Sequence, residues 1–290
     1  MKSYNDLLNE YKKVFNDKET LRAFLFELCN ELDIDLYMEK DRQADERVIK
    51  KFEDGVKRLV NNEPLNYVLG YSYFYGYKMI VNKDVLIPRF ETEELVGLIL
   101  SFIDEHYKDK KRIKLADIGT GSGAIAIALK KEEEKLDVLA SDISSEAIEV
   151  ARQNAKNNDA EIEFLVGSML DPLVEKGIKL DVLVSNPPYI KKSEVLEPSV
   201  KDYEPHVALF GGDDGLKFYR MIFDKADKVM NKKGMLFFEM GYDQKEALTD
   251  LARQYFKNAE IKVFKDINKK DRMLSIVLWF HKHFTSLWYK

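Results

Sequence analysis

The sequence predicts an α/β protein in which a small helical domain precedes a doubly wound sheet. Apolar residues recur at helical spacing in the first 65 residues, whereas from residue 113 short apolar runs alternate with amphipathic segments. Two of the apolar runs end in GTGSG and NPPY, and motifs at strand ends are typical of ligand sites in such sheets. With 45% apolar residues in 290, the chain can bury a core in each part.

The amino-terminal 65 residues are expected to form helices. Their apolar positions repeat every three or four residues, at Leu21, Phe24, Leu25, Leu28 and Leu32 and again at Val48, Phe52, Val56, Leu59 and Val60. After Pro64 the composition changes, and the aromatic and glycine-rich stretch 67–80 predicts a β-hairpin. The sheet domain follows this hairpin.

The remaining elements follow an alternation of strands and helices. Strands are expected at 113–118, 136–141, 161–166, 180–185, 234–239, 261–264 and 273–280, and helices at 124–129, 145–157, 215–230 and 243–256. The stretch 190–214 has two prolines, a Gly-Gly pair and little regular pattern. It is predicted to be a long loop beside the site.

The glycine loop Gly119–Gly123 follows the first strand of the sheet and opens a helix. Glycines let the backbone approach a ligand closely, and the free N–H groups of a helix start are expected to favour a carboxylate or phosphate. With Ala124 the spacing also fits the looser dinucleotide fingerprint. The loop therefore predicts a cofactor site without deciding the cofactor.

Asp142 ends the next strand, about 20 residues beyond the glycines. A carboxylate there suits the two ribose hydroxyls that S-adenosylmethionine (SAM) and NAD share. Alternatively, Asp142 is the N-cap of the helix that starts near Ser145. The sequence leaves both interpretations open.

Asn186-Pro187-Pro188-Tyr189 directly follows the buried strand 180–185. The Asn186 side-chain oxygen and the Pro187 backbone carbonyl are two acceptors that can hold an NH₂ group. Tyr189 adds an aromatic face for a planar amide or base. The tetrapeptide therefore predicts a site for an amino or amide nitrogen, the alternative being a turn that merely closes the strand.

Composition excludes several classes of protein. Residues 1–85 carry a net charge of −2 and the rest −3, which argues against a duplex-DNA binder. The basic residues near the end, Lys262, Lys265, Lys269, Lys270 and Arg272, are expected to be a solvated face. The single cysteine, Cys29, excludes an internal disulfide, and no metal-binding motif is present. Without a signal sequence or a long apolar span, a cytoplasmic protein is expected.

Four groups of residues together resemble one family. They are VLIPRFETE (85–93), DIGTGSGAIA (117–126), SNPPYI (185–190) and the series Glu204-Pro205, Ala208-Leu209 and Asp214-Gly215-Leu216. In this order they resemble the SAM-dependent glutamine N5-methyltransferases that modify peptide chain release factors in translation termination. NPPY alone is shared with DNA adenine methyltransferases, whereas the first and last groups are more specific.

The resemblance implies a domain plan and an activity. It implies a helical substrate-docking domain (1–65), a β-hairpin linker (66–85) and a seven-stranded methyltransferase domain (86–290) whose last strand is antiparallel. The reaction would be N5-methylation of the glutamine in a release factor's Gly-Gly-Gln motif, converting SAM to S-adenosylhomocysteine. A monomer without metal is expected.

The resemblance also implies site residues. The cofactor residues would be Gly119, Thr120, Gly121, Ser122 and Gly123 at the methionine part, Asp142 and Ile143 at the ribose, and Met169 and Asn186. The catalytic residues would be Asn186, Pro187 and Tyr189, and the substrate residues would add Pro188, Arg89 and Glu91.

The sequence departs from the family's pattern at Phe90, Asn66 and Ser168-Met169. The last change leaves the adenine contacts open, because Met169 suits either a flexible apolar wall or the core. Two rival activities also remain. A DNA adenine-N6 methyltransferase would need base flipping and a basic surface, and an NAD-dependent dehydrogenase would leave NPPY unexplained.

Overall fold

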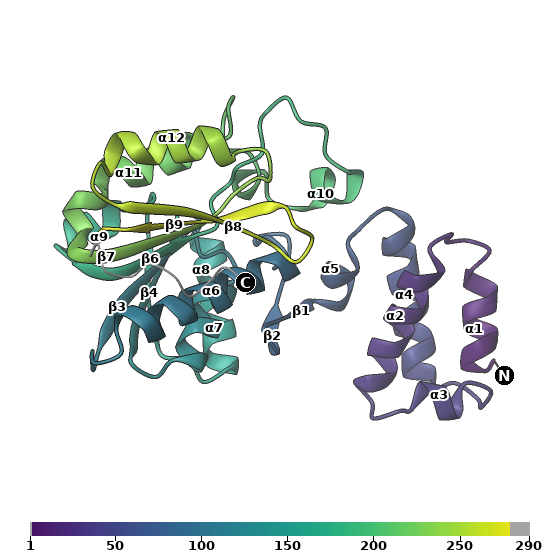
Figure 1. Cartoon of the computed structure of the whole chain (residues 1–290). Helices are drawn as coiled ribbons and strands as arrows, with labels where there is room; N and C mark the ends of the chain where they lie inside the picture. Colours follow the sequence, from purple (N-terminus) through teal and green to yellow (C-terminus); the bar gives the residue numbers. More distant parts are fainter. Residues whose placement is uncertain (1, 279–290) are drawn as a thin grey trace. The chain divides into compact units, whose positions relative to one another are not determined.

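The computed structural model describes residues 2–278. Within them the chain forms two compact units (Figure 1). The first comprises residues 2–71 together with 196–203, and the second comprises 72–195 and 204–278. The inclusion of 196–203 in the first unit was not indicated by the sequence pattern.

The first unit is a bundle of helices. They are α1 (Tyr4–Tyr11), α2 (Lys18–Asn30), α3 (Leu36–Glu39), α4 (Glu46–Val60), α5 (Leu65–Leu69) and α10 (Pro198–Tyr203). Phe24 of α2 and Phe52 of α4 stack at its centre with ring centroids 5.4 Å apart. A Cβ at Gly55 would lie 2.2 Å from the Phe24 ring, so glycine allows α2 and α4 to pack closely. α10 joins this unit through the Tyr203 hydroxyl, which donates to the Asn61 carbonyl at 2.7 Å.

The expected β-hairpin is confirmed as β1 (Tyr71–Phe74) and β2 (Tyr77–Ile80), whereas residues 67–69 of the expected stretch belong to α5. Tyr75 and Gly76 between them both have positive φ (52° and 81°), as a tight two-residue hairpin turn requires. The Asn154 side chain accepts from the Ile80 N–H at 2.6 Å and donates to the Ile80 carbonyl at 3.0 Å. These bonds hold β2 against the helix that carries Asn154.

The expected doubly wound sheet is also confirmed, with seven strands in the order β5-β4-β3-β6-β7-β9-β8. β9 runs antiparallel to β7 and β8, and the other neighbouring pairs are parallel. The strands are β3 (Ile113–Ile118), β4 (Leu136–Asp142), β5 (Ile162–Val166), β6 (Leu180–Ser185), β7 (Met230–Glu239), β8 (Glu260–Lys265) and β9 (Asp271–Val277).

Helices cover both faces of this sheet (Figure 1). One face carries α6 (Phe90–His106), α7 (Ala124–Glu132) and α8 (Ser145–Asn157), and the other carries α9 (Asp171–Glu175), α11 (Lys217–Val229) and α12 (Lys245–Tyr255). Along β7, Met235 and Phe237 pack into the first core, whereas Leu236 and Phe238 pack into the second. Burial on both faces explains why the central strands are continuous apolar runs.

The structure adds elements that the sequence analysis did not assign. α6 is a long helix between the hairpin and β3, and α10 and a 3₁₀ turn (His206–Ala208) lie within the stretch expected to be irregular. β7 starts at Met230, before the expected 234. The expected strand 273–280 is β9 as far as Val277, and residues 279 and 280 lie outside the described part of the chain.

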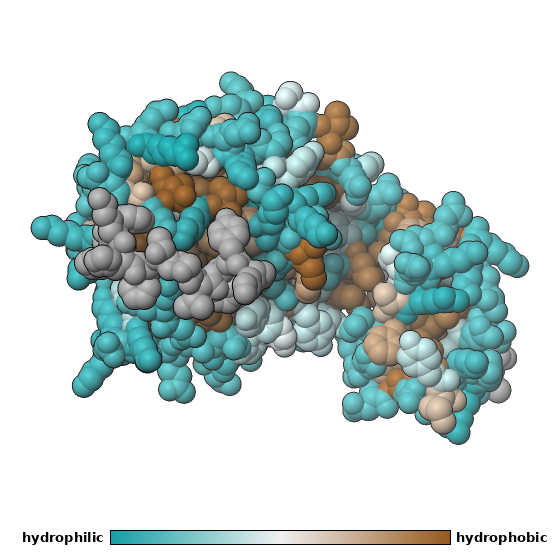
Figure 2. Space-filling view, viewed as in Figure 1, coloured by the Kyte–Doolittle hydropathy of each residue, from teal (hydrophilic) through white to brown (hydrophobic). Residues whose placement is uncertain are grey.

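Hydrophilic residues cover most of the surface seen in Figure 2, and hydrophobic residues show through only in separate patches. Within residues 2–278, no helix combines the length and apolarity that a membrane crossing needs. The same residues contain no cluster of three or more histidine, cysteine or acidic side chains arranged to hold a metal ion.

Candidate active site

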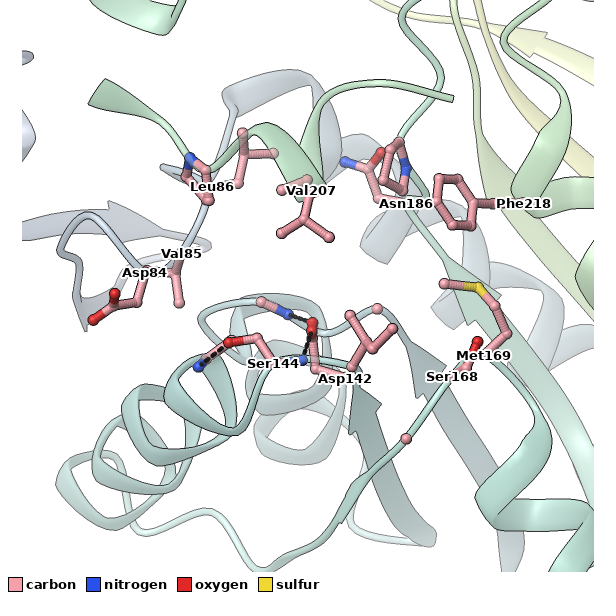
Figure 3. A pocket seen from close by; sticks show the side chains of 18 of the residues that line it. Asp84, Val85, Leu86, Asp142, Ser144, Ser168, Met169, Asn186, Val207 and Phe218 are labelled. Atoms are coloured by element: carbon pink, nitrogen blue, oxygen red, sulfur yellow. Dashed lines mark hydrogen bonds between the residues drawn. The ribbon is translucent and has the colours of Figure 1, made fainter. Parts of the chain in front are cut away.

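The predicted motifs converge at one edge of the sheet. β3 lies between β4 and β6, so the glycine loop, Asp142 and Asn186 follow neighbouring parallel strands at their carboxyl ends. They surround a cavity of about 270 Å³ (Figure 3). Its wall comprises Asp84, Val85, Leu86, Gly119, Gly121, Asp142, Ile143, Ser144, Ala147, Gly167, Ser168, Met169, Asn186, Pro188, Pro205, Val207, Ala208, Lys217, Phe218 and Met221.

Gly119 and Gly121 are the residues of the glycine loop that face the cavity. Both have positive φ (74° and 54°), and a Cβ on either would meet no atom within 4 Å. A Cβ on Gly123 would instead lie 3.1 Å from the Ala151 Cβ. The first two glycines thus leave space for a ligand, whereas Gly123 lets α7 pack closely against α8.

Four N–H groups of this loop have acceptors within the protein. Those of Gly119 and Thr120 donate to the Ser141 carbonyl, at 2.8 and 3.0 Å. The Gly123 N–H donates to Thr120, and the Gly121 N–H donates to the Asp142 carboxylate at 2.9 Å. These donors are used within the protein, because the loop turns back onto the end of β4.

Asp142 lies on the cavity wall and holds the loop in place (Figure 3). Its carboxylate accepts from the N–H groups of Gly121 and Ser144. The alternative interpretation of Asp142 as a helix N-cap is wrong, because Ser144 caps α8 by accepting from the Ala147 N–H at 3.0 Å. Burial raises the pKa of Asp142 above its ordinary value, although these hydrogen bonds act to lower it.

A second carboxyl group, Asp117, lies beneath the loop and is fully buried. Its Oδ2 accepts from the Thr120 hydroxyl at 2.6 Å, and its Oδ1 has no hydrogen-bond partner among the described residues. Burial, with the nearby charge of Asp142, raises its pKa to about 7. Asp142 lines the cavity, whereas Asp117 lies behind the wall, and neither acid forms an ion pair within residues 2–278.

The raised pKa of Asp117 makes stability depend on pH. In the ligand-free protein its pKa is about 7, against 3.8 for the free side chain, so the folded state binds the proton more tightly. Stability from this group is therefore complete below pH 4 and is lost as the pH rises through 7. Between pH 5 and 8 we expect a loss of about 3 kcal/mol.

Urea denaturation at pH 5 and pH 8 measures this loss, with Asp117→Asn as the comparison. The neutral amide cannot ionise, so the pH dependence should be smaller in the variant by about that amount. Equal pH dependence in the two proteins would contradict the assignment.

NPPY divides between the cavity wall and the protein interior. Asn186 and Pro188 line the cavity, whereas Pro187 is buried and Tyr189 is not part of the cavity wall. The Tyr189 hydroxyl lies 3.3 Å from the Glu239 carboxylate. Asn186 therefore lies at the cavity, whereas Tyr189 contacts Glu239.

The loop Gly211–Gly215 supports NPPY from behind. The Gly211 N–H donates to the Ile190 carbonyl at 2.8 Å, and the Gln244 side chain donates to the Tyr189 carbonyl at 3.1 Å. Gly215 has φ +75°, and a Cβ there would lie 2.4 Å from the Tyr189 carbonyl oxygen. Glycine is therefore required where this loop meets the motif.

We expect Gly215→Ala to destabilise the protein and to slow its reaction. Gly177 is the matched control, because it also has positive φ (+63°) but a Cβ there meets nothing within 4 Å. Gly177→Ala should cost about 1–2 kcal/mol through backbone strain alone. Gly215→Ala should cost more in urea denaturation, and only it should reduce activity. Equal losses in the two variants would show that the contact with Tyr189 is unimportant.

An apolar wall closes the cavity at the ends of β5 and α11. Met169, Val207, Phe218 and Met221 line it, and Met169 adopts a left-handed backbone conformation with φ 45°. Figure 3 shows Val207 and Phe218 across the cavity from Asp142. Met169 is thus part of the wall, although only 9% of its surface is exposed. Sequence reasoning missed Val207, Phe218 and Met221, because they lie in a stretch without a motif and on an amphipathic helix.

Several predicted residues do not reach the cavity. Thr120, Ser122 and Gly123 support the loop from within, and Arg89 and Glu91 are absent from the wall. Arg89 pairs instead with the buried Glu204 at 2.6 Å. Ile143 does line the cavity and is 54% exposed.

Comparison with known proteins agrees with this architecture. Residues 97–202 match the family model of the methyltransferase small domain, and residues 6–70 match that of the PrmC N-terminal domain. Among solved structures the chain is similar to a methyltransferase from Pyrococcus furiosus (18% identity, TM-score 0.51, 79% of this chain and 100% of that one). It is also similar to the N-terminal domain of human METTL16 in complex with SAH (17% identity, TM-score 0.50, 79% and 84%). The fold and the site define the chain as a methyltransferase.

Curated relatives give the family. The chain is 44% identical to the release factor glutamine methyltransferase of Bacillus cereus, over 85% of this chain and 89% of that protein. It is 41% identical to that of Bacillus subtilis (80% and 81%) and 40% identical to that of Francisella tularensis (84% and 86%). The chain belongs to the release factor glutamine methyltransferase family.

Proposed function

We propose that this enzyme transfers the methyl group of SAM to the side-chain nitrogen of the glutamine in a release factor's Gly-Gly-Gln motif. The observation that carries the proposal is the position of Asn186, which presents an amide at the cofactor cavity directly after β6. The family relationship supports release factors as the substrate. The first unit, in this proposal, docks the release factor.

The cavity suits SAM better than a dinucleotide. Four N–H groups of the glycine loop donate to Ser141, Asp142 and Thr120, which leaves fewer donors for a pyrophosphate. Asp142 lines the cavity and forms no ion pair within residues 2–278, and a sulfonium or ammonium group would offset its charge. One cation, Lys217, does lie in the wall, next to the Phe218 ring.

Each part of SAM has matching residues. Asp142, beside Ile143, would accept from the ribose hydroxyls, and Gly119 and Gly121 leave room for the methionine part. The apolar wall of Met169, Phe218 and Met221 suits a planar adenine. When bound, SAM supplies an electrophilic methyl group on a positively charged sulfur.

The residues of NPPY would position the glutamine. Its amide nitrogen is a weak nucleophile, because the lone pair is delocalised into the carbonyl. The Asn186 oxygen and the Pro187 carbonyl would accept its two N–H groups and aim the nitrogen at the methyl carbon. Both acceptors also stabilise the positive charge that develops on nitrogen. A proton then leaves that nitrogen for solvent, which restores the neutral amide.

The two rival activities fit less well. Three of the five basic residues near the end form ion pairs: Lys262 with Glu260, Lys265 with Asp271, and Arg272 with Asp266. This arrangement gives no support to a duplex-DNA surface. A dehydrogenase leaves the position of Asn186 without a role. Both alternatives are disfavoured by the family relationship.

An assay with labelled SAM tests the proposal. It offers the protein a release factor with Gly-Gly-Gln, the same factor with that glutamine changed to alanine, and unmethylated duplex DNA. We expect methylation of the first alone, with mass spectrometry locating one added methyl group on the glutamine. Transfer to the alanine variant or to DNA would overturn the substrate assignment.

A further inference from the structure

A series of hydrogen-bonded side chains runs from Asn186 into the protein interior. It comprises Asn186 after β6, Thr92 in the first turn of α6 and Glu239 at the end of β7. The Asn186 Nδ2 is 3.4 Å from the Thr92 Oγ1, which is 2.6 Å from the Glu239 Oε2. Thr92 is 4% exposed and Glu239 is 2% exposed, so water does not substitute for these contacts.

The chemistry of these three side chains fixes the direction of the hydrogen bonds between them. An ionised carboxylate only accepts hydrogen bonds, so the single hydroxyl proton of Thr92 is donated to Glu239. The Thr92 oxygen can then only accept a hydrogen bond, and the other side chain that it contacts in this series is Asn186. The Asn186 NH₂ group must therefore face Thr92, which leaves the Asn186 side-chain oxygen directed away from Thr92.

Glu239 accepts hydrogen bonds through its side chain and its backbone. Burial raises the pKa of its carboxyl group, and the hydrogen bond from Thr92 and the positive charge of Arg272 oppose that rise. Tyr189 donates to its other oxygen at 3.3 Å, and Tyr219 donates to its backbone carbonyl at 2.7 Å. Glu239 thus contacts both ends of NPPY, one directly and one through Thr92.

We infer that Thr92 and Glu239 are positioning residues that fix the Asn186 amide with its oxygen toward the substrate nitrogen. The inference rests on the proposed function, since it explains how Asn186 becomes an acceptor. Neither residue lines the cavity, so they act through Asn186 and not on the substrate. A reversed amide would present NH₂ to the substrate NH₂, and two donors repel each other.

A matched pair of variants at Thr92 tests the inference. Thr92→Val keeps the shape but loses the hydroxyl, and we expect the single-turnover rate to fall at least about tenfold with SAM affinity within about twofold of wild type. Thr92→Ser keeps the hydroxyl and should recover most of the lost rate. Thr249→Val is the control, because it removes a buried hydroxyl in α12 that has no hydrogen-bond partner among the described residues.

Glu239→Gln is a second variant, which decides the question if Thr92→Val does not fold. The amide of the variant can either donate to or accept from Thr92, so the direction of the hydrogen bonds is no longer unique. We therefore expect the rate of methyl transfer to fall at least about threefold with SAM binding retained. Transfer rates within twofold of wild type for the folded variants would refute the inference. A wild type that does not methylate the glutamine would refute the proposed function instead.

Discussion

Asn186→Ala should reduce the rate of methyl transfer by at least about a hundredfold while SAM still binds. The variant removes one of two acceptors for the substrate amide, and loss of one such hydrogen bond at a reacting centre commonly costs about 10²–10³ in rate. Asn186 is one residue among many in the cavity wall, so the cofactor should lose little affinity. Single-turnover assays give the rate, and isothermal titration calorimetry gives the SAM affinity.

Asn157→Ala is the control for this variant, because Asn157 is an exposed residue at the end of α8. It should retain both rate and affinity. Normal turnover by Asn186→Ala would remove the residue from the mechanism. A large loss of SAM affinity with little change in rate would instead assign Asn186 to the cofactor.

Asp142→Ala should weaken SAM binding by at least about a hundredfold. Two hydrogen bonds from the ribose to a carboxylate would be lost, and bonds to charged groups are worth about 1.5–3 kcal/mol each. The variant also leaves the N–H groups of Gly121 and Ser144 without their acceptor, so the loop loses its attachment to β4. Isothermal titration calorimetry with SAM measures the effect directly.

Asp137→Ala is the matched control, because it removes a carboxylate from the opposite end of the same strand. Asp137 pairs with Arg112 at 3.1 Å and does not line the cavity. Its removal should change SAM affinity by less than about twofold. If the two alanine variants bound SAM equally well, the ribose assignment of Asp142 would be wrong.

Features that depend on short stretches of sequence could be predicted. The boundaries of β3 and β6 follow from apolar runs buried on both sides, and the glycine loop and NPPY follow directly after them. Their proximity follows from strand order in a doubly wound sheet. The positions of Gly119, Asp142 and Asn186 at one cavity were therefore accessible before the structure was known.

Features that depend on partners distant in the sequence could not be predicted. The Thr92 hydroxyl meets Glu239 across 147 positions, and neither residue type by itself indicates a buried hydrogen bond. Four N–H groups of the glycine loop have acceptors within the protein, which only the path of the backbone reveals. Arg89 was expected at the substrate, but it pairs with Glu204, which lies 115 positions away in the sequence.

The placement of residues 196–203 in the first unit has a consequence for protein engineering. The first unit is discontinuous in sequence, since α10 joins it from within the segment that follows NPPY. A single cut near residue 71 would leave the amino-terminal fragment without α10 and the carboxyl-terminal fragment with an unpartnered helix. Separating the two units into independently folded proteins would require removing 196–203 from one and supplying it to the other.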